Sequence, residues 1–294
     1  MIIKDMAKLK FLKGVDMMPD LPIKFSMLPL LLLLQFFAIW FVTHRAKKQG
    51  QITKSGSMLM TILLILLVGW TVISSYLAIN HTYLSNWFLA SWPAFWVTFV
   101  AVTLVMIPLV VSAGARDVLR SIIDATPLHW MIGFQALRIF ALGGIIKSLN
   151  GDFALYYGLY IGIPDFIFGL SALVMFWLVS SNRVGYKTVT VWNLLGAMII
   201  VPFGMVLLQM GLAGPWQTFT DAPTITTIFE FPMALAPTVV VPIFVMTNLL
   251  VALRLVERLM AGENSPARPR AGSSSQRWEQ PQSVPVPWEI RKSW

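Results

Sequence analysis

The chain has 294 residues, of which 57% are hydrophobic and only 12% are charged, and its mean hydropathy is +0.72. Soluble domains carry about a quarter of their residues as charges, so the composition excludes an ordinary soluble globular protein and indicates a polytopic membrane protein. The chain has no cysteine, which excludes disulfides, thiolate catalysis and iron–sulfur clusters. Its net charge of +9 does not indicate a nucleic-acid partner, because the basic residues flank apolar runs.

Seven apolar runs are long enough to cross a bilayer, which takes about 20 helical residues. They predict an all-α polytopic membrane helix bundle over residues 25–260, preceded by a basic N-terminal segment, 1–24. The last segment, 261–294, is rich in Ser, Pro, Gln and Arg and is predicted to be disordered. The seven predicted spans are 25–43, 57–80, 91–113, 130–149, 157–180, 189–210 and 236–257.

The stretch ARDVLRSIID, 115–124, predicts a short interfacial helix between the third and fourth spans. Lysine and arginine concentrate in the first, third and fifth connections and in the C-terminal tail, whereas the connections 81–90 and 211–235 contain none. The positive-inside rule then predicts seven spans in the plasma membrane, with the N-terminus outside and the C-terminus cytoplasmic. Five N-terminal lysines argue against this, and they would be cytoplasmic if the first run did not cross: Lys4, Lys8, Lys10, Lys13 and Lys24.

Two charged residues fall inside predicted spans: Arg138 in the fourth and Asp165 in the fifth. The midpoint between them falls in the turn LNGD, 149–152, so two antiparallel helices joined there would bring them to the same depth. An unpaired charge at that depth costs at least ~2.5–3.5 kcal/mol, which predicts an ion pair. The pair could fix helix packing or line a polar site for a ligand, and both interpretations stay open.

Three amides are further candidates for ligand binding. Gln135 lies three residues before Arg138 and shares its helix face, so it is expected to hydrogen-bond Asp165 or a ligand. Asn193 and Asn248, in the sixth and seventh spans, are expected to form hydrogen bonds between helices or to contact a ligand. The ligand-binding candidates are therefore Arg138, Asp165, Gln135, Asn193 and Asn248. By contrast, Arg254 and Glu257 near the end of the last span are expected to snorkel to the interface without a special role.

The connection 211–237 is long, semi-apolar and rich in threonine. A connection of that length indicates either a lid over a binding site or a short helix on the membrane surface. Catalytic and metal-binding motifs are missing from the sequence, and its three histidines are far apart: His44, His81 and His129. No metal and no cofactor are expected, and nothing in the sequence favours an enzyme.

Residues 128–258 resemble a family of uncharacterised bacterial multi-pass membrane proteins. The matching pieces, in order, are QALRIFALGG, GIPDFIFGL, VWNLLG and APTVVVP. The positions that carry over are Arg138, Asp165, Trp192, Asn193, Pro237 and Pro242. Relatives tend to have an Asp near position 199 and a His near position 248, where this chain has Ile199 and Asn248. The resemblance implies a bacterial plasma membrane and the pairing of spans four and five, and a proton- or metal-handling role is expected to be weaker in this chain than in the family.

These features support three hypotheses. The first is a membrane protein that binds or passes a small molecule through the polar centre around Arg138 and Asp165. The second is a non-catalytic accessory subunit that docks on another membrane protein through its helix faces or its tail, whose tryptophans could serve as anchors: Trp278, Trp288 and Trp294. The third, a membrane-embedded enzyme, lacks a cluster of catalytic residues. The lipid bilayer is a partner in all three.

Overall fold

The computed structural model describes residues 26–91 and 94–264, and within these residues every regular element is a helix. The basic N-terminal segment and almost all of the predicted tail, including its tryptophans, lie outside the described residues. Six of the predicted runs form helices long and apolar enough to cross a membrane, which suggests a membrane protein. They are α2 (Leu28–Lys48), α3 (Lys54–Ile79), and four interrupted helices at Leu128–Asn150, Leu155–Ser180, Tyr186–Met210 and Ala236–Met260.

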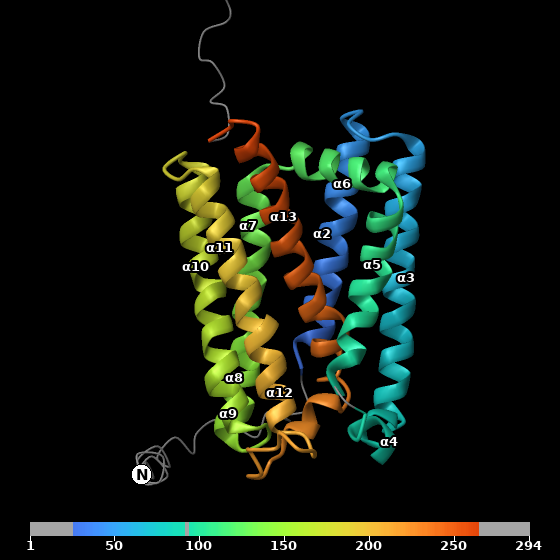
Figure 1. The fold of residues 1–294 in the computed structure, drawn as a ribbon, viewed down its shortest axis with the longest axis vertical. Coiled ribbons are helices and arrows are strands. Elements are labelled where there is room, and N and C mark those ends of the chain that lie inside the picture. Colours follow the sequence, from blue (N-terminus) through green and yellow to red (C-terminus); the bar gives the residue numbers. More distant parts are fainter. Residues whose placement is uncertain (1–25, 92–93, 265–294) are drawn as a thin grey trace, which may run out of the picture.

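The third predicted run, 91–113, is the one that departs from a straight span. The helix α5 (Thr98–Val111) is followed at once by α6 (Ala113–Ala125), and the two are bent by 110°. Ser112 lies in the bend, where its hydroxyl accepts a hydrogen bond from the backbone N–H of Ala115 at 3.2 Å and caps α6. The expected helix over 115–124 is therefore present, and it lies across one end of the bundle (Figure 1).

The last helix, α13 (Val241–Met260), is the central helix of the bundle. In the most apolar stretch of its span, 61% of the residues are buried inside the protein, against 22–39% in the other five spans. The other helices therefore surround it. Its first half packs on α2 through residues such as Ile243 and Phe244. Its second half packs on Leu128–Gln135 (α7) and Tyr186–Met198 (α11) through residues such as Val251.

The connection 211–235 folds into the end of the bundle opposite α6. It contains the 3-10 helix η7 (Ile225–Phe229), whose Ile225 and Phe229 are fully buried. Phe229 packs edge-on against Phe88 of the short helix α4 (Asn86–Leu89), with ring centroids 5.2 Å apart. The connection is thus a packed cap on the bundle (Figure 1), and a separate helix lying on a membrane surface, one of the two expectations, is not present among its residues.

Candidate functional site

Four of the six long helices contain a short non-α segment, here called an interruption; two of these segments lie near the middle of their helices and two in the first turns at the end opposite α6. The segment η4 (Ala136–Ala141) is a 3-10 helix, whereas η5 (Gly158–Gly162), η6 (Ile199–Gly204) and η8 (Ala236–Val240) are π-helical. Within η6, Val201 leaves the helical conformation altogether. Short π-helical and 3-10 segments inside longer helices often occur at functional sites, and broken helices at membrane depth occur where they line a cavity or are buried in protein.

A partly open cavity of about 220 Å³ lies among these four interruptions. Each contributes to the lining: Ala141 from η4, Ile161 from η5, Gly204 from η6 and Pro237 from η8. The lining is mostly apolar; its charged side chains are Arg138, Lys147 and Asp165, and its hydroxyls belong to Ser26, Thr98 and Tyr157. The end cap contributes Ile228 and Met233, so the segment expected to be a lid covers part of this cavity.

The predicted ion pair between Arg138 and Asp165 is present in the cavity wall. Nε of Arg138 donates to Oδ1 of Asp165 at 2.6 Å, and its Nη2 contacts the same oxygen. The arginine side chain is fully buried, whereas 16% of the aspartate side chain is exposed. No hydrogen bond to Oδ2 of Asp165 is present among the described residues, and Asp165 is one of the residues that line the cavity.

The Arg138 guanidinium is held on two further sides. Its Nη1 donates to the carbonyl of Gly196 on α11 at 3.0 Å, and its Cζ lies 4.4 Å from the ring centre of Phe168. Phe168 in turn stacks on Trp192, with centroids 4.3 Å apart. The arginine therefore ties three helices together, since Phe168 belongs to α10 (Ile163–Ser180) and Trp192 and Gly196 belong to α11.

Glycine allows these helices to approach closely. A Cβ at Gly169 would lie 2.6 Å from the backbone nitrogen of Ile139 and 2.9 Å from the carbonyl carbon of Arg138. Real Cβ atoms do not come that close to backbone, so α10 can rest directly on η4 only with glycine here. A Cβ at Gly196 would overlap the Phe168 ring. Two glycines thus set the spacing that brings Asp165 within reach of Arg138.

The interruptions free backbone carbonyls, and side chains from neighbouring helices satisfy several of them. Nε2 of Gln35 donates to the carbonyl of Val240 at 3.1 Å, and Nε1 of Trp70 donates to that of Thr238 at 3.0 Å. At the end of α12 (Met205–Met210), the Tyr156 hydroxyl likewise donates to the carbonyl of Leu207 at 3.1 Å. Such side-chain donors are what make broken helices tolerable at membrane depth, so the interruptions belong to a supported architecture.

The three candidate amides do not make the contacts expected of them. Gln135 is fully buried, and neither Nε2 nor Oε1 has a partner among the described residues, so the expected hydrogen bond to Asp165 is absent. Asn193 bonds within its own helix, to the carbonyl of Val189 at 2.9 Å, and not to another helix. Asn248 is fully buried with both amide atoms unpartnered. The prediction that these side chains form hydrogen bonds between helices was wrong.

The positions of Gln135, Asn193 and Asn248 along their helices nevertheless place the three amides at the same height in the bundle. Arg138 and Gly196 are hydrogen-bonded across η4 and α11, and Gln135 and Asn193 each lie one turn before them on the side of α6. The core residues of α13 on either side of Asn248 pack against α7 and α11. A layer of buried amides therefore lies next to the ion pair, and none of the three lines the 220 Å³ cavity.

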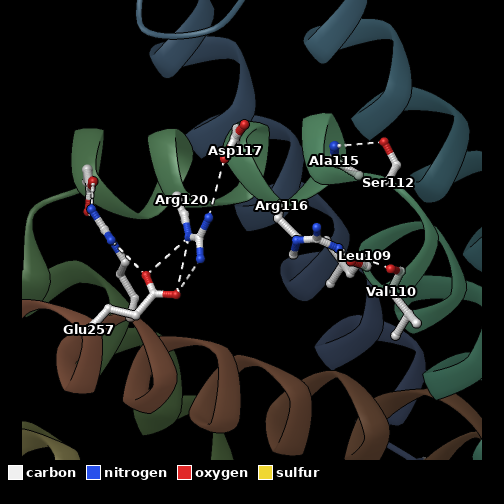
Figure 2. A network of polar contacts seen from close by, with 10 residues as sticks. Leu109, Val110, Ser112, Ala115, Arg116, Asp117, Arg120 and Glu257 are labelled. Carbon is white, nitrogen blue, oxygen red and sulfur yellow. Dashed lines mark hydrogen bonds and ion pairs between the residues drawn. The ribbon is translucent and has the colours of Figure 1, made fainter.

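The sequence did not predict a second charged cluster, which joins α6 to the end of α13. Arg120 bonds both carboxylate oxygens of Glu257, with Nη2 to Oε1 at 2.6 Å and Nε to Oε2 at 3.1 Å (Figure 2). Arg254 donates to Asp124 at 2.9 Å through Nε and to Glu257 at 2.7 Å, and Arg258 donates to Asp124 at 2.6 Å. Arg254 and Glu257 thus connect α13 to α6, whereas the sequence predicted only that they snorkel to the interface.

The charges of this cluster also affect Asp124. Burial by itself would raise the pKa of Asp124, but the hydrogen bonds and charges of Arg254 and Arg258 outweigh it and hold that pKa below the usual value. The signal that could have revealed the cluster is the helical spacing of charges in both stretches. Arg116, Arg120 and Asp124 follow each other at intervals of four, and Arg254 and Arg258 do the same.

Fold and site together define a class: an all-helical bundle whose interrupted helices enclose a cavity with an ion pair in its wall. Residues 94–256 match the model of a family described as a domain of unknown function, DUF8737. The match covers more than half of the chain, and the protein belongs to this family. No curated protein and no solved structure matches the chain. The matched region contains the ion pair, the amide layer and all four interruptions.

Proposed function

We propose that this protein is a plasma-membrane protein that binds or passes a small amphipathic anion through the 220 Å³ cavity at Arg138 and Asp165. The observation that carries the proposal is the convergence of four helix interruptions on one cavity with an ion pair in its wall. Interrupted helices near the middle of a membrane are the elements from which transporters build substrate sites. Ionisable groups inside a membrane mark substrate or ion pathways by default.

The charge balance of the lining favours an anion. Arg138 and Asp165 neutralise each other, whereas Lys147 lines the same cavity and has no ion-pair partner among the described residues. One positive charge therefore remains in a mostly apolar lining, which also includes Tyr157. A solute with an apolar body and a single carboxylate matches this lining, because its anionic group would face Lys147 while its body contacts the apolar walls.

The orientation with α6 in the cytoplasm follows from the basic residues. Near the α6 end the described helices and loops carry many Lys and Arg residues, whereas the cap end has Lys147. The basic residues at the α6 end are Arg45, Lys47, Lys48, Lys54, Arg116, Arg120, Arg183, Lys187, Arg254 and Arg258. The positive-inside rule then supports a cytoplasmic α6 end and a cavity on the outer side.

Single-cysteine variants test the cavity, since the natural chain has no cysteine to interfere. Ala236→Cys places a thiol in the cavity lining, and Leu170→Cys places one on the outer surface of α10. Thiols react as thiolates, which require water. In proteoliposomes, water-soluble methanethiosulfonates are expected to modify the first variant and not the second. An anionic reagent should react faster than a cationic one, and Lys147→Gln should remove that preference.

Occupancy is tested with benzoate, a small carboxylate with an apolar ring. Benzoate should slow the modification of the Ala236→Cys variant by a neutral reagent, whereas benzyl alcohol, which has the same ring without the charge, should not. If the Ala236→Cys thiol does not react, the cavity is closed to water and the proposal fails. If the thiol reacts but the cationic reagent is favoured, the assignment to an anion is wrong.

The accessory-subunit hypothesis remains the second proposal. The tail that motivated it lies outside the described residues, but the outer surfaces of α3 and α10 carry exposed apolar side chains without charges, among them Ile65, Val72 and Val174. Purification in a mild detergent from the natural host tests it. A stoichiometric partner supports this alternative, whereas a lone chain that retains benzoate-sensitive cysteine modification supports the proposed binding function.

A further inference from the structure

A second, larger cavity of about 450 Å³ lies on the α6 side of the bundle. It shares no lining residue with the cavity at Arg138. Its walls come from α2, α3, α5, α6, α7, η4 and α13, and α6 covers the end of it with Leu119, Ile122 and Ile123. Its volume falls in the range of about 300–1,000 Å³ that is usual for small-molecule sites.

The lining of this cavity offers almost nothing to a polar ligand. It contains no charged side chain, and the hydroxyls of its three threonines are already used within their own helices. Thr43 donates to Ile39 at 2.8 Å, Thr126 to Ile122 at 2.7 Å and Thr247 to Ile243 at 2.8 Å. A cavity of this kind stays dry and accepts apolar molecules. Its occupant is therefore a hydrocarbon group.

The cavity reaches the outer surface of the bundle between α2 and α7. Leu34, Phe41 and Trp130 all line it, and they are 36%, 39% and 39% exposed. Phe41 and Trp130 face each other with ring centroids 5.8 Å apart. In the bilayer placement proposed above, the medium at this opening is lipid, so a hydrocarbon chain can enter sideways from the membrane.

A cation lies at the same opening. The guanidinium of Arg45 lies 4.4 Å from the ring centre of Trp130. Its Nη1 is shielded from solvent and has no hydrogen-bond partner among the described residues. A shielded guanidinium nitrogen without a partner is costly, and a phosphate oxygen would satisfy it. Lys47 and Lys48, which are exposed in the same last turn of α2, add positive charge.

We propose that this cavity is a binding site for an anionic phospholipid, with one acyl chain between α2 and α13 and the phosphate on Arg45. This inference rests on the bilayer placement in the proposed function, but not on the site at Arg138. The apolar walls explain the acyl chain, and the lateral opening explains its route. Nη1 of Arg45, which has no hydrogen-bond partner among the described residues, explains the preference for a negative headgroup.

The experiment uses the full chain in nanodiscs that contain phosphatidylcholine and a trace of a phospholipid with a photoactivatable diazirine near the end of one acyl chain. After illumination, mass spectrometry locates the labelled residues. With a phosphatidylglycerol headgroup, label is expected on deep cavity residues such as Leu63 and Met246. With a phosphatidylcholine headgroup on the same chain, labelling of these residues should fall about fivefold, the effect of one cation on an anionic lipid.

Two pairs of variants make the result specific. Arg45→Gln should reduce cavity labelling by phosphatidylglycerol to the phosphatidylcholine level. Arg183→Gln is its control, because Arg183 also stacks on a tryptophan, 4.3 Å from the Trp177 ring, but Trp177 does not line the cavity as Trp130 does. Ala38→Phe fills the cavity and should abolish its labelling, whereas Leu33→Phe, at a 65% exposed position of the same helix, should not.

Label on outward-facing residues, such as Ile65 of α3, reports insertion into the bilayer independently of the cavity. Surface label without cavity label would overturn the lipid site and leave the bilayer placement intact. Absence of both would overturn the bilayer placement itself. Equal cavity labelling by the two headgroups, or no effect of Arg45→Gln, would overturn the assignment to an anionic lipid.

Discussion

Arg138 and Asp165 lie 27 residues apart in the chain, yet Nε of the arginine lies 2.6 Å from Oδ1 of the aspartate, inside the bundle. The same arginine donates to Gly196 of a third helix. The ion pair therefore joins the two helices on which its residues lie, and the bond to Gly196 joins them to α11. Its contribution to stability and its contribution to ligand binding can be separated by substitution.

Removing one partner of the ion pair should be much worse than removing both. Arg138→Leu leaves a buried carboxylate without its cation, which costs ~3–5 kcal/mol in comparable buried pairs. Arg138→Leu combined with Asp165→Leu removes that cost, and thermal unfolding in detergent should recover most of the lost stability. Arg183→Leu, an exposed arginine, is the control and should change little. If the double variant is as unstable as Arg138→Leu, Arg138 stabilises the protein mainly through contacts other than its ion pair with Asp165.

Gly169→Ala should destabilise the protein by ~1–3 kcal/mol, the usual cost of overpacking a filled interior. The added methyl would meet the backbone of η4 beside Arg138, which cannot move without shifting the helix. Gly69→Ala is the matched control, since a Cβ there meets nothing within 4 Å. The comparison is made by thermal unfolding of both variants, and equal stability of the two would contradict the close packing of α10 on η4.

Thr238→Val should also destabilise the protein, by ~1–3 kcal/mol. The hydroxyl of Thr238 accepts from Ser74 at 2.9 Å and donates to the carbonyl of Ala234 at 2.7 Å, and all of this is buried. Valine has the same shape but removes the acceptor of the Ser74 hydroxyl and one of the two hydrogen bonds that the Ala234 carbonyl accepts. Thr61→Val is the control, because Thr61 is exposed and bonds only within its own helix. The measurement is chemical unfolding of the two variants in the same detergent.

The contact between α6 and α13 should weaken in acid. The pKa of Asp124 is held below its usual value by Arg254 and Arg258, so its stabilising effect is present above the unfolded pKa of about 3.9 and is lost as pH falls through the lower folded pKa. The difference in melting temperature between the wild type and Asp124→Asn should be largest near neutral pH and shrink below about pH 4. Asp152→Asn, an exposed carboxylate at the other end of the bundle, should show no such dependence.

The sequence predicted much of the architecture, because apolar runs of membrane length have few alternatives to helices. It also predicted the contact of Arg138 with Asp165, since a short turn between two helices fixes which positions are level. It did not predict the isolation of Gln135 and Asn248, because whether a buried amide finds a partner depends on side-chain directions that helical spacing does not specify. The cluster at Arg120 and Glu257 was missed because it joins stretches 137 residues apart.

The concentration of interruptions in one half of the bundle has a mechanical consequence. Around α6 the hydrogen-bond ladders are regular and a charged cluster fastens α6 to α13, so that half behaves as a fixed base. Toward the other end three helices have a joint within them, at η4, η5 and η6, and the fourth begins with η8. Bending at such joints breaks fewer backbone hydrogen bonds than bending a regular helix. These segments are therefore the positions at which the helices around the cavity would bend at the lowest cost.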